Sequence, residues 1–104
     1  MRSRPHDVAM AEFFKEDPAF AIEFLNSILA DGTQEDLMIA LRQMALAFGG
    51  VRAVAEQAEL NPTQLYRTLS VDGNPSLSSL CAILQTMGLR MAVEPIEKAA
   101  AAHA

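Results

Sequence analysis

The chain pairs a helix-capping residue with proline at several points, and each such pair marks where a helix begins. Asp and Asn side chains accept hydrogen bonds from the first free N–H groups of a helix, and proline in the first turn loses no bond because its position needs no donor. The pairs are Asp17-Pro18, Asn61-Pro62 and Asn74-Pro75. The chain is therefore expected to be a series of helices with fixed starting points.

Apolar residues recur at helical spacing between these starts, and glycines follow the ends. Thr33 provides one further cap, with Asp36 three residues later. The expected helices cover residues 18–31, 34–48, 51–58, 62–71 and 75–87. The spacing predicts an all-α fold of five helices.

The periodicity changes after Gly88, where apolar and other residues alternate from Leu89 to Val93 before Pro95. Such alternation predicts a short C-terminal β-strand. A lone strand leaves its hydrogen-bonding edges unpaired, so we expect it to pair with another subunit. Residues 1–96 are expected to form one domain, and the alanine-rich tail 97–104 a frayed helix. The expected homodimer contacts are Leu89, Met91 and Val93.

The charge of the chain is concentrated near its start. The 104 residues carry a net charge of −5, and residues 1–36 hold eight acidic and three basic side chains. Overall charge therefore disfavours nucleic-acid binding, and such a site has to rest on local charge. The acidic front is either solvent-exposed charge or a surface that attracts a basic partner. Its residues include Glu12, Glu16, Asp17 and Glu23.

The sequence lacks the residues that several classes of function require. The single cysteine, Cys81, lies on an apolar helical face and is expected to be buried. His6 and His103 both lie near the termini, so neither is expected to be catalytic. We expect no enzyme, metal or cofactor. No membrane span or signal peptide is recognisable, so a cytoplasmic protein is expected.

The helices expected at 51–58 and 62–71 are short and joined by a tight turn at Glu59–Asn61, which is a helix-turn-helix pattern over about residues 51–70. Similar pairs occur in all-helical proteins that never meet DNA. If the pattern does bind DNA, its second helix would enter a major groove, and the residues that cap the next helix would contact the DNA backbone. The candidate DNA-binding residues are Arg52, Asn61, Thr63, Gln64, Tyr66, Arg67, Ser70, Asn74 and Ser76.

Some of these residues have a second interpretation. Gln64 has capping-box spacing to Asn61, so its side chain either contacts a DNA base or forms a hydrogen bond with the protein backbone at the start of its own helix. Arg52 either binds a phosphate or pairs with Glu56 one helical turn away. Tyr66 either contacts DNA or packs its ring against the edge of the domain.

The segment 51-VRAVAEQAELNPTQLYRTLSVDGNPSLSSLCAILQTMGLRMAV-93 resembles the probable addiction-module antidote proteins, HigA-type antitoxins of the lambda-repressor-like (XRE) helix-turn-helix superfamily. The likeness rests on the LYR-x-LS run, the G-N-P-S corner and the ending L-x-x-M-G-L-R, and 17-DPAFAIEFLNSILADGTQEDLMIALRQMALAFGG-50 resembles the family's opening. The resemblance implies a lambda-repressor-like domain that dimerises, binds its own operator DNA and represses its own transcription. It also implies a small basic RelE-like toxin as partner, and a recognition helix at Asn61–Ser70.

One residue departs from the family pattern, because Glu59 stands where the turn commonly has glycine. Glu59 either adopts a left-handed conformation at some cost or changes the shape of the turn. It also adds negative charge near the expected DNA face. Two alternatives to the antitoxin therefore stay open: a stand-alone repressor, and a toxin-binding module whose DNA binding is vestigial.

Overall fold

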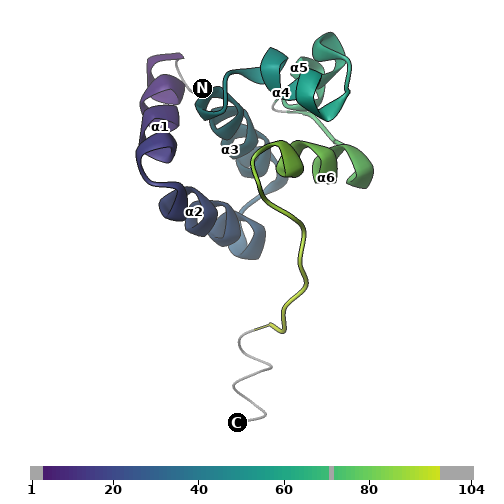
Figure 1. The fold of residues 1–104 in the computed structure, drawn as a ribbon. Coiled ribbons are helices and arrows are strands. Elements are labelled where there is room, and N and C mark those ends of the chain that lie inside the picture. The colour runs from purple at the N-terminus through teal and green to yellow at the C-terminus, as the bar shows by residue number, and fades with distance from the viewer. Residues whose placement is uncertain (1–3, 71, 97–104) are drawn as a thin grey trace.

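The computed structural model describes residues 4–70 and 72–96, which form six α-helices. In Figure 1, α1, α2 and α3 form one half of the molecule, α4, α5 and α6 form the other, and the segment after α6 extends away from both. The helices are α1 (Arg4–Glu16), α2 (Pro18–Asp31), α3 (Gln34–Ala47), α4 (Val51–Ala58), α5 (Pro62–Thr68) and α6 (Leu77–Thr86). The all-α prediction is confirmed.

The expected caps at the starts of α2 and α3 are present. Asp17 Oδ1 accepts a hydrogen bond from the N–H of Phe20 at 3.1 Å. Thr33 and Asp36 form a reciprocal capping box, in which each side chain accepts from the other's backbone N–H at 3.1 Å. The sequence therefore fixes the first turn of both helices by local bonds.

Helix α1 was not among the expected helices, the first of which was expected to begin at residue 18. It has no capping pair before it, and its stability comes from packing on α3. Ala11 and Phe14 are buried. The buried amide of Gln43 on α3 donates to Asp7 Oδ1 on α1 at 3.0 Å. The five-helix count was therefore one too low for the residues that the structure describes.

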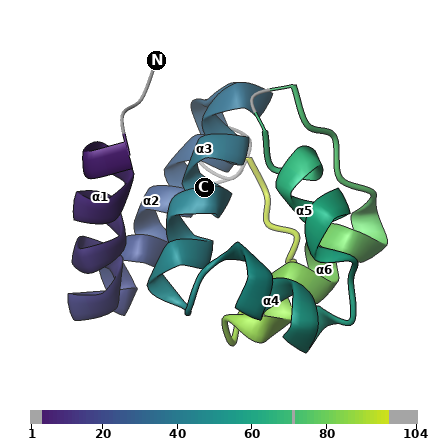
Figure 2. The same ribbon diagram turned by 90° about the horizontal axis from the view of Figure 1, so that it is seen from above.

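Helix α3 lies at the centre of the fold. Figure 2 shows it between α1 on one side and the group α4, α5 and α6 on the other. Its buried residues face both groups, which explains why so much of its surface is inaccessible. They are Met38, Ala40, Leu41, Gln43, Met44, Ala45 and Ala47.

Helix α2 buries a narrower face than its sequence indicated. Ala21 and Leu25 are its buried residues, whereas Ile22 and Leu29 are 41% and 51% exposed. The apolar stripe of α2 is thus wider than the surface that α1 and α3 cover.

The structure differs from expectation at the C-terminal end. Helix α6 begins at Leu77 after the cap of Ser76, not at Pro75, and α5 ends at Thr68. The predicted β-strand at Leu89–Val93 is not confirmed. No other segment among residues 4–70 and 72–96 pairs with it, and a strand needs a pairing partner.

Within the described ranges, no single helix is both long and apolar enough to cross a membrane; α3 and α4 reach that length and composition only when joined across an 89° bend. The predicted tail 97–104 lies outside the described residues. The assignment of residues 1–96 to one domain stays a prediction.

Candidate nucleic-acid interface

The turn between α4 and α5 is built on a left-handed residue. Glu59 has φ 59° and ψ 42°, and it is the only non-glycine residue with positive φ in the described part of the chain. The N–H of Leu60 donates to the carbonyl of Ala55 at 2.8 Å, and that of Glu59 to Glu56 at 3.2 Å. These bonds end α4 with a Schellman-type closure, whose left-handed position usually holds glycine. Of the two possibilities for Glu59, the left-handed one is therefore observed.

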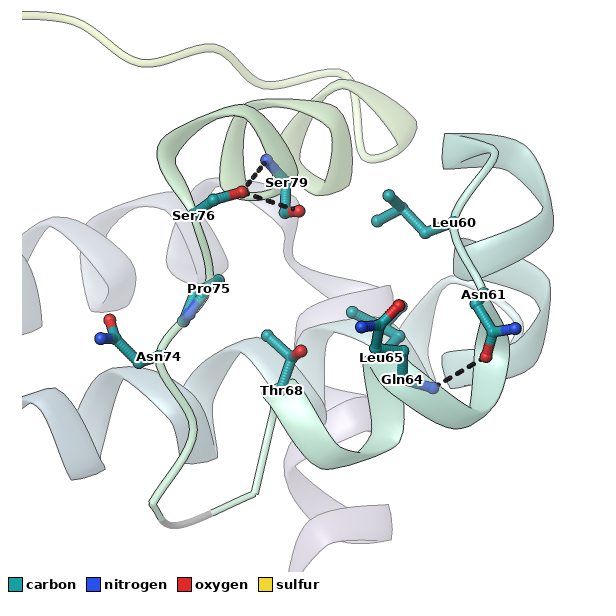
Figure 3. Close-up of a pocket in the computed structure, with 9 residues that line it drawn as sticks. All are labelled: Leu60, Asn61, Gln64, Leu65, Thr68, Asn74, Pro75, Ser76 and Ser79. Atoms are coloured by element: carbon teal, nitrogen blue, oxygen red, sulfur yellow. Dashed lines mark hydrogen bonds between the residues drawn. The ribbon is translucent and has the colours of Figure 1, made fainter.

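Asn61 starts α5 as predicted, since its Oδ1 accepts from the N–H of Gln64 at 2.9 Å (Figure 3). The side chain of Gln64 makes no hydrogen bond to any described residue, so the cap uses only its backbone. Leu65 and Leu69 are 3% and 0% exposed and anchor α5 in the core. Gln64 thus keeps its amide group available on the surface.

The helical geometry of α5 determines the direction in which each of its outer side chains points. Thr63 and Arg67, one turn apart, lie opposite the buried Leu65 and Leu69, and both are exposed. Tyr66 lies on one flank and is 59% exposed, so its ring is not tucked into the core. The outermost side chains of α5 are therefore a hydroxyl and an unpaired guanidinium, within the described residues.

The other flank of α5 borders a groove shared with the start of α6 (Figure 3). The groove has a volume of about 250 Å³. Ser76 caps α6 there, accepting from the N–H of Ser79 at 3.1 Å and donating to the Ser79 hydroxyl at 3.0 Å. Polar side chains from both helices thus surround one depression. Its lining residues are Leu60, Asn61, Gln64, Leu65, Thr68, Asn74, Pro75, Ser76 and Ser79.

Besides the two capping residues Asn61 and Ser76, two further candidate residues are engaged within the fold. Arg52 Nε lies 3.8 Å from Glu56 Oε2, the ion pair considered as the alternative to phosphate binding. The side chains are 77% and 67% exposed, so the pair contributes only a few tenths of a kcal/mol and exchanges readily. The hydroxyl of Ser70 donates to the carbonyl of Arg67 at 2.7 Å and thereby closes the end of α5.

Sequence reasoning missed two side chains of α3 that position this region. Arg42 Nε donates to the carbonyl of Leu69 at 3.2 Å, and Gln34 Nε2 donates to the carbonyl of Gly73 at 2.8 Å. The partners are 27 and 39 residues apart, so no local pattern indicates them. Gly73 itself is needed for space, because an added Cβ would overlap the carbonyl oxygen of Thr68.

The predicted dimer residues lie away from this face, on the segment that leaves α6. Leu89 packs against the core and is half-buried. Met91 and Val93 are 38% and 99% exposed. Their role in a dimer stays a prediction. Cys81, expected to be buried, is only partly so.

Comparison with known families identifies one match. Residues 5–95 match the family model described as "Probable addiction module antidote protein", which spans α2 to α6 and nearly all of α1. Comparisons with curated proteins and with solved structures gave no match.

Proposed function

Because this chain belongs to the family of probable addiction module antidote proteins, we propose that it is an antitoxin that binds operator DNA and neutralises a partner toxin. Membership of this family implies that the chain is an antitoxin and that it has a toxin as its partner. The further elements of the proposal are a homodimer, repression of the chain's own transcription, and a small basic toxin of the RelE-like class.

The observation that carries DNA binding is the outer surface of α5. This helix follows α4 through a tight turn, is anchored by Leu65 and Leu69, and presents Thr63, Gln64 and Arg67 to solvent. A helix held in this way fits the major groove, where arginine reads guanine and glutamine reads adenine. Arg67 is the residue to which we assign the strongest contact.

The surroundings of α5 suit the DNA backbone. Asn74 and Ser76 stand at the start of α6, where free N–H groups favour a phosphate, across the groove from Gln64. Arg52 would exchange its exposed partner Glu56 for a phosphate, and Tyr66 would pack on a sugar or donate to a phosphate. These contacts would fix the register of α5 without reading sequence.

The dimer would place two copies of α5 on one face of the duplex. In this proposal the segment around Leu89, Met91 and Val93 pairs with its counterpart in the second copy. The two-fold axis would then separate the half-sites by about one turn of DNA, ~34 Å. Occupying the promoter in this way would repress transcription.

The antitoxin role is tested by expressing the reading frame next to this gene, alone and together with this chain. We expect that frame to encode a small basic protein that arrests growth alone and is harmless when this chain is present. A neighbour that is harmless by itself would contradict a toxin–antitoxin pair and leave a stand-alone repressor.

One observation favours a second candidate, a toxin-binding module without DNA binding. Glu56 pairs with Arg52 on α4 and Glu59 follows at the end of that helix, so two carboxylates offset the positive charges of Arg52 and Arg67. Under this alternative, growth rescue would remain while the chain shows no preference for its own upstream DNA.

A further inference from the structure

A second groove lies between α1, α2 and α3, and the DNA-binding proposal makes no use of it. Its volume is about 410 Å³. Apolar side chains cover most of its surface, and three polar side chains complete its lining. The apolar lining residues are Met10, Phe24, Ile28, Ile39 and Ala40, and the polar ones are His6, Asp36 and Gln43.

The apolar surface continues beyond the groove along α1. Phe13 lies one helical turn after Met10 on the same side of α1, and it is 57% exposed although it belongs to an aromatic cluster. Its ring centroid is 5.1 Å from that of Phe20, which stacks in turn on Phe24 at 6.0 Å. A row of partly exposed aromatic rings therefore leads into the groove. Contiguous exposed apolar surface rimmed by polar residues is a feature of docking sites.

The charge around this groove is negative. Residues 1–36 hold eight acidic and three basic side chains, whereas the remaining residues hold five of each, so the net charge of −5 resides in the first part of the chain. Asp36 lies in the groove, and Asp7 is held at its edge by the amide of Gln43 at 3.0 Å. Asp31 is exposed at the last position of α2, three residues after Ile28.

The position of Asp31 supports a role in binding. The C-terminal end of a helix carries partial negative charge, so a carboxylate there is unfavourable and a cation favourable. The last turn of α2 contains no basic residue. Asp31 therefore opposes the stability of its own helix while it adds negative charge next to the groove.

We propose that this α1–α2–α3 groove is where the basic toxin docks, inserting apolar anchor side chains flanked by lysine or arginine. This inference rests on the proposed antitoxin function and names its contact surface. Apolar anchors in a desolvated groove supply most of the affinity of an interface, and complementary charge at the rim directs and accelerates association. Met10 in the groove suits such anchors, because the flexible methionine side chain adapts to the shape of a partner.

The groove and α5 lie on different sides of the molecule. Figure 2 shows α1 and α2 across α3 from α5. A toxin in the groove leaves the outer face of α5 uncovered. We therefore expect the toxin-bound chain to keep its affinity for operator DNA.

The test measures binding of the protein encoded by the adjacent reading frame to the full chain and its variants by titration calorimetry. Ile39→Gln places an amide in the apolar groove, and Asp31→Lys reverses the charge at its edge. Each is expected to weaken binding about tenfold or more. Leu77→Gln is the matched control, since Leu77 is 68% exposed on α6, away from the groove, and its substitution should leave the affinity unchanged.

Asp31→Lys separates loss of binding from loss of folding. A lysine at the end of α2 stabilises the helix, so the melting temperature of the Asp31→Lys variant should equal or exceed that of the wild type. If the wild type binds the neighbouring protein and neither groove variant weakens that binding, the docking site is overturned, whereas the antitoxin function still stands. Failure of the wild type to bind the neighbour overturns the neutralisation proposal itself.

Discussion

Arg42 Nε on α3 donates a hydrogen bond to the carbonyl of Leu69 at 3.2 Å, which joins the central helix to the end of α5. The bond satisfies a carbonyl that the helix leaves free, and the positive charge favours the negative end of the helix dipole. We expect Arg42→Met, which keeps the apolar stem, to lower the free energy of unfolding by about 1–2 kcal/mol. Arg90→Met, at an exposed arginine, should change it by less than about 0.5 kcal/mol. Chemical denaturation of both variants measures the difference, and equal effects would show that the Arg42 bond is not structural.

The left-handed backbone of Glu59 predicts a stabilising substitution. That conformation costs a residue with a Cβ about 1–2 kcal/mol, which glycine avoids while losing more chain entropy on folding. We expect Glu59→Gly to raise the free energy of unfolding by about 0.5–1 kcal/mol. Glu56→Gly removes the same charge one turn earlier, inside α4, and should instead destabilise by about 1 kcal/mol. Denaturant unfolding of both variants tests this account of the turn. It would be contradicted if both substitutions changed the free energy of unfolding in the same direction.

Asn61 caps α5 and is proposed to contact DNA, and a change of charge separates these two roles. Asn61→Ala removes the acceptor for the N–H of Gln64 and should cost about 1 kcal/mol of stability. Asn61→Asp keeps the cap and should retain stability, yet its negative charge would face the DNA phosphates. Thermal melts combined with operator binding distinguish the roles. Wild-type affinity in Asn61→Asp would show that Asn61 lies outside the DNA contact.

The proposed dimer is tested on the segment after α6. Val93 is 99% exposed, so Val93→Lys should leave the fold of the single chain intact while placing a charge in the proposed subunit interface. We expect this variant to sediment as a monomer at concentrations where the wild type is a dimer. Ala92→Lys is the matched control, because its side chain points to the opposite side of an extended segment and should leave the dimer unchanged. A Val93→Lys dimer would contradict the interface.

Residues near one another in sequence made the fold predictable. The caps of Asp17, Thr33 and Asn61 act on N–H groups only three residues away, and each forms as expected. Helix α1 and the bond from Arg42 depend instead on packing between distant segments, which no local pattern reveals. The β-strand expectation failed in the single chain because pairing requires a second segment.

The candidate site shows the same division. The exposure of Thr63 and Arg67 follows from the helical period set by Leu65 and Leu69, and it could be predicted from the sequence. The sequence left the position of the Tyr66 ring open, and the structure shows it exposed. The groove that brings Gln64 and Asn74 together could not, because it depends on how α6 returns beside α5. Family resemblance supplied the proposed partners, which residue chemistry alone would have left open.

Fluorescence anisotropy with the DNA upstream of this gene tests the central claim, which is that α5 recognises operator DNA through Arg67. We expect the wild type to prefer that DNA over a scrambled duplex, with an affinity that falls as salt is added. Arg67→Ala should weaken binding about tenfold or more, while Lys15→Ala, a charge removed on α1, should bind as the wild type does. A wild type without preference for its upstream DNA, or an Arg67→Ala variant of unchanged affinity, would contradict the account.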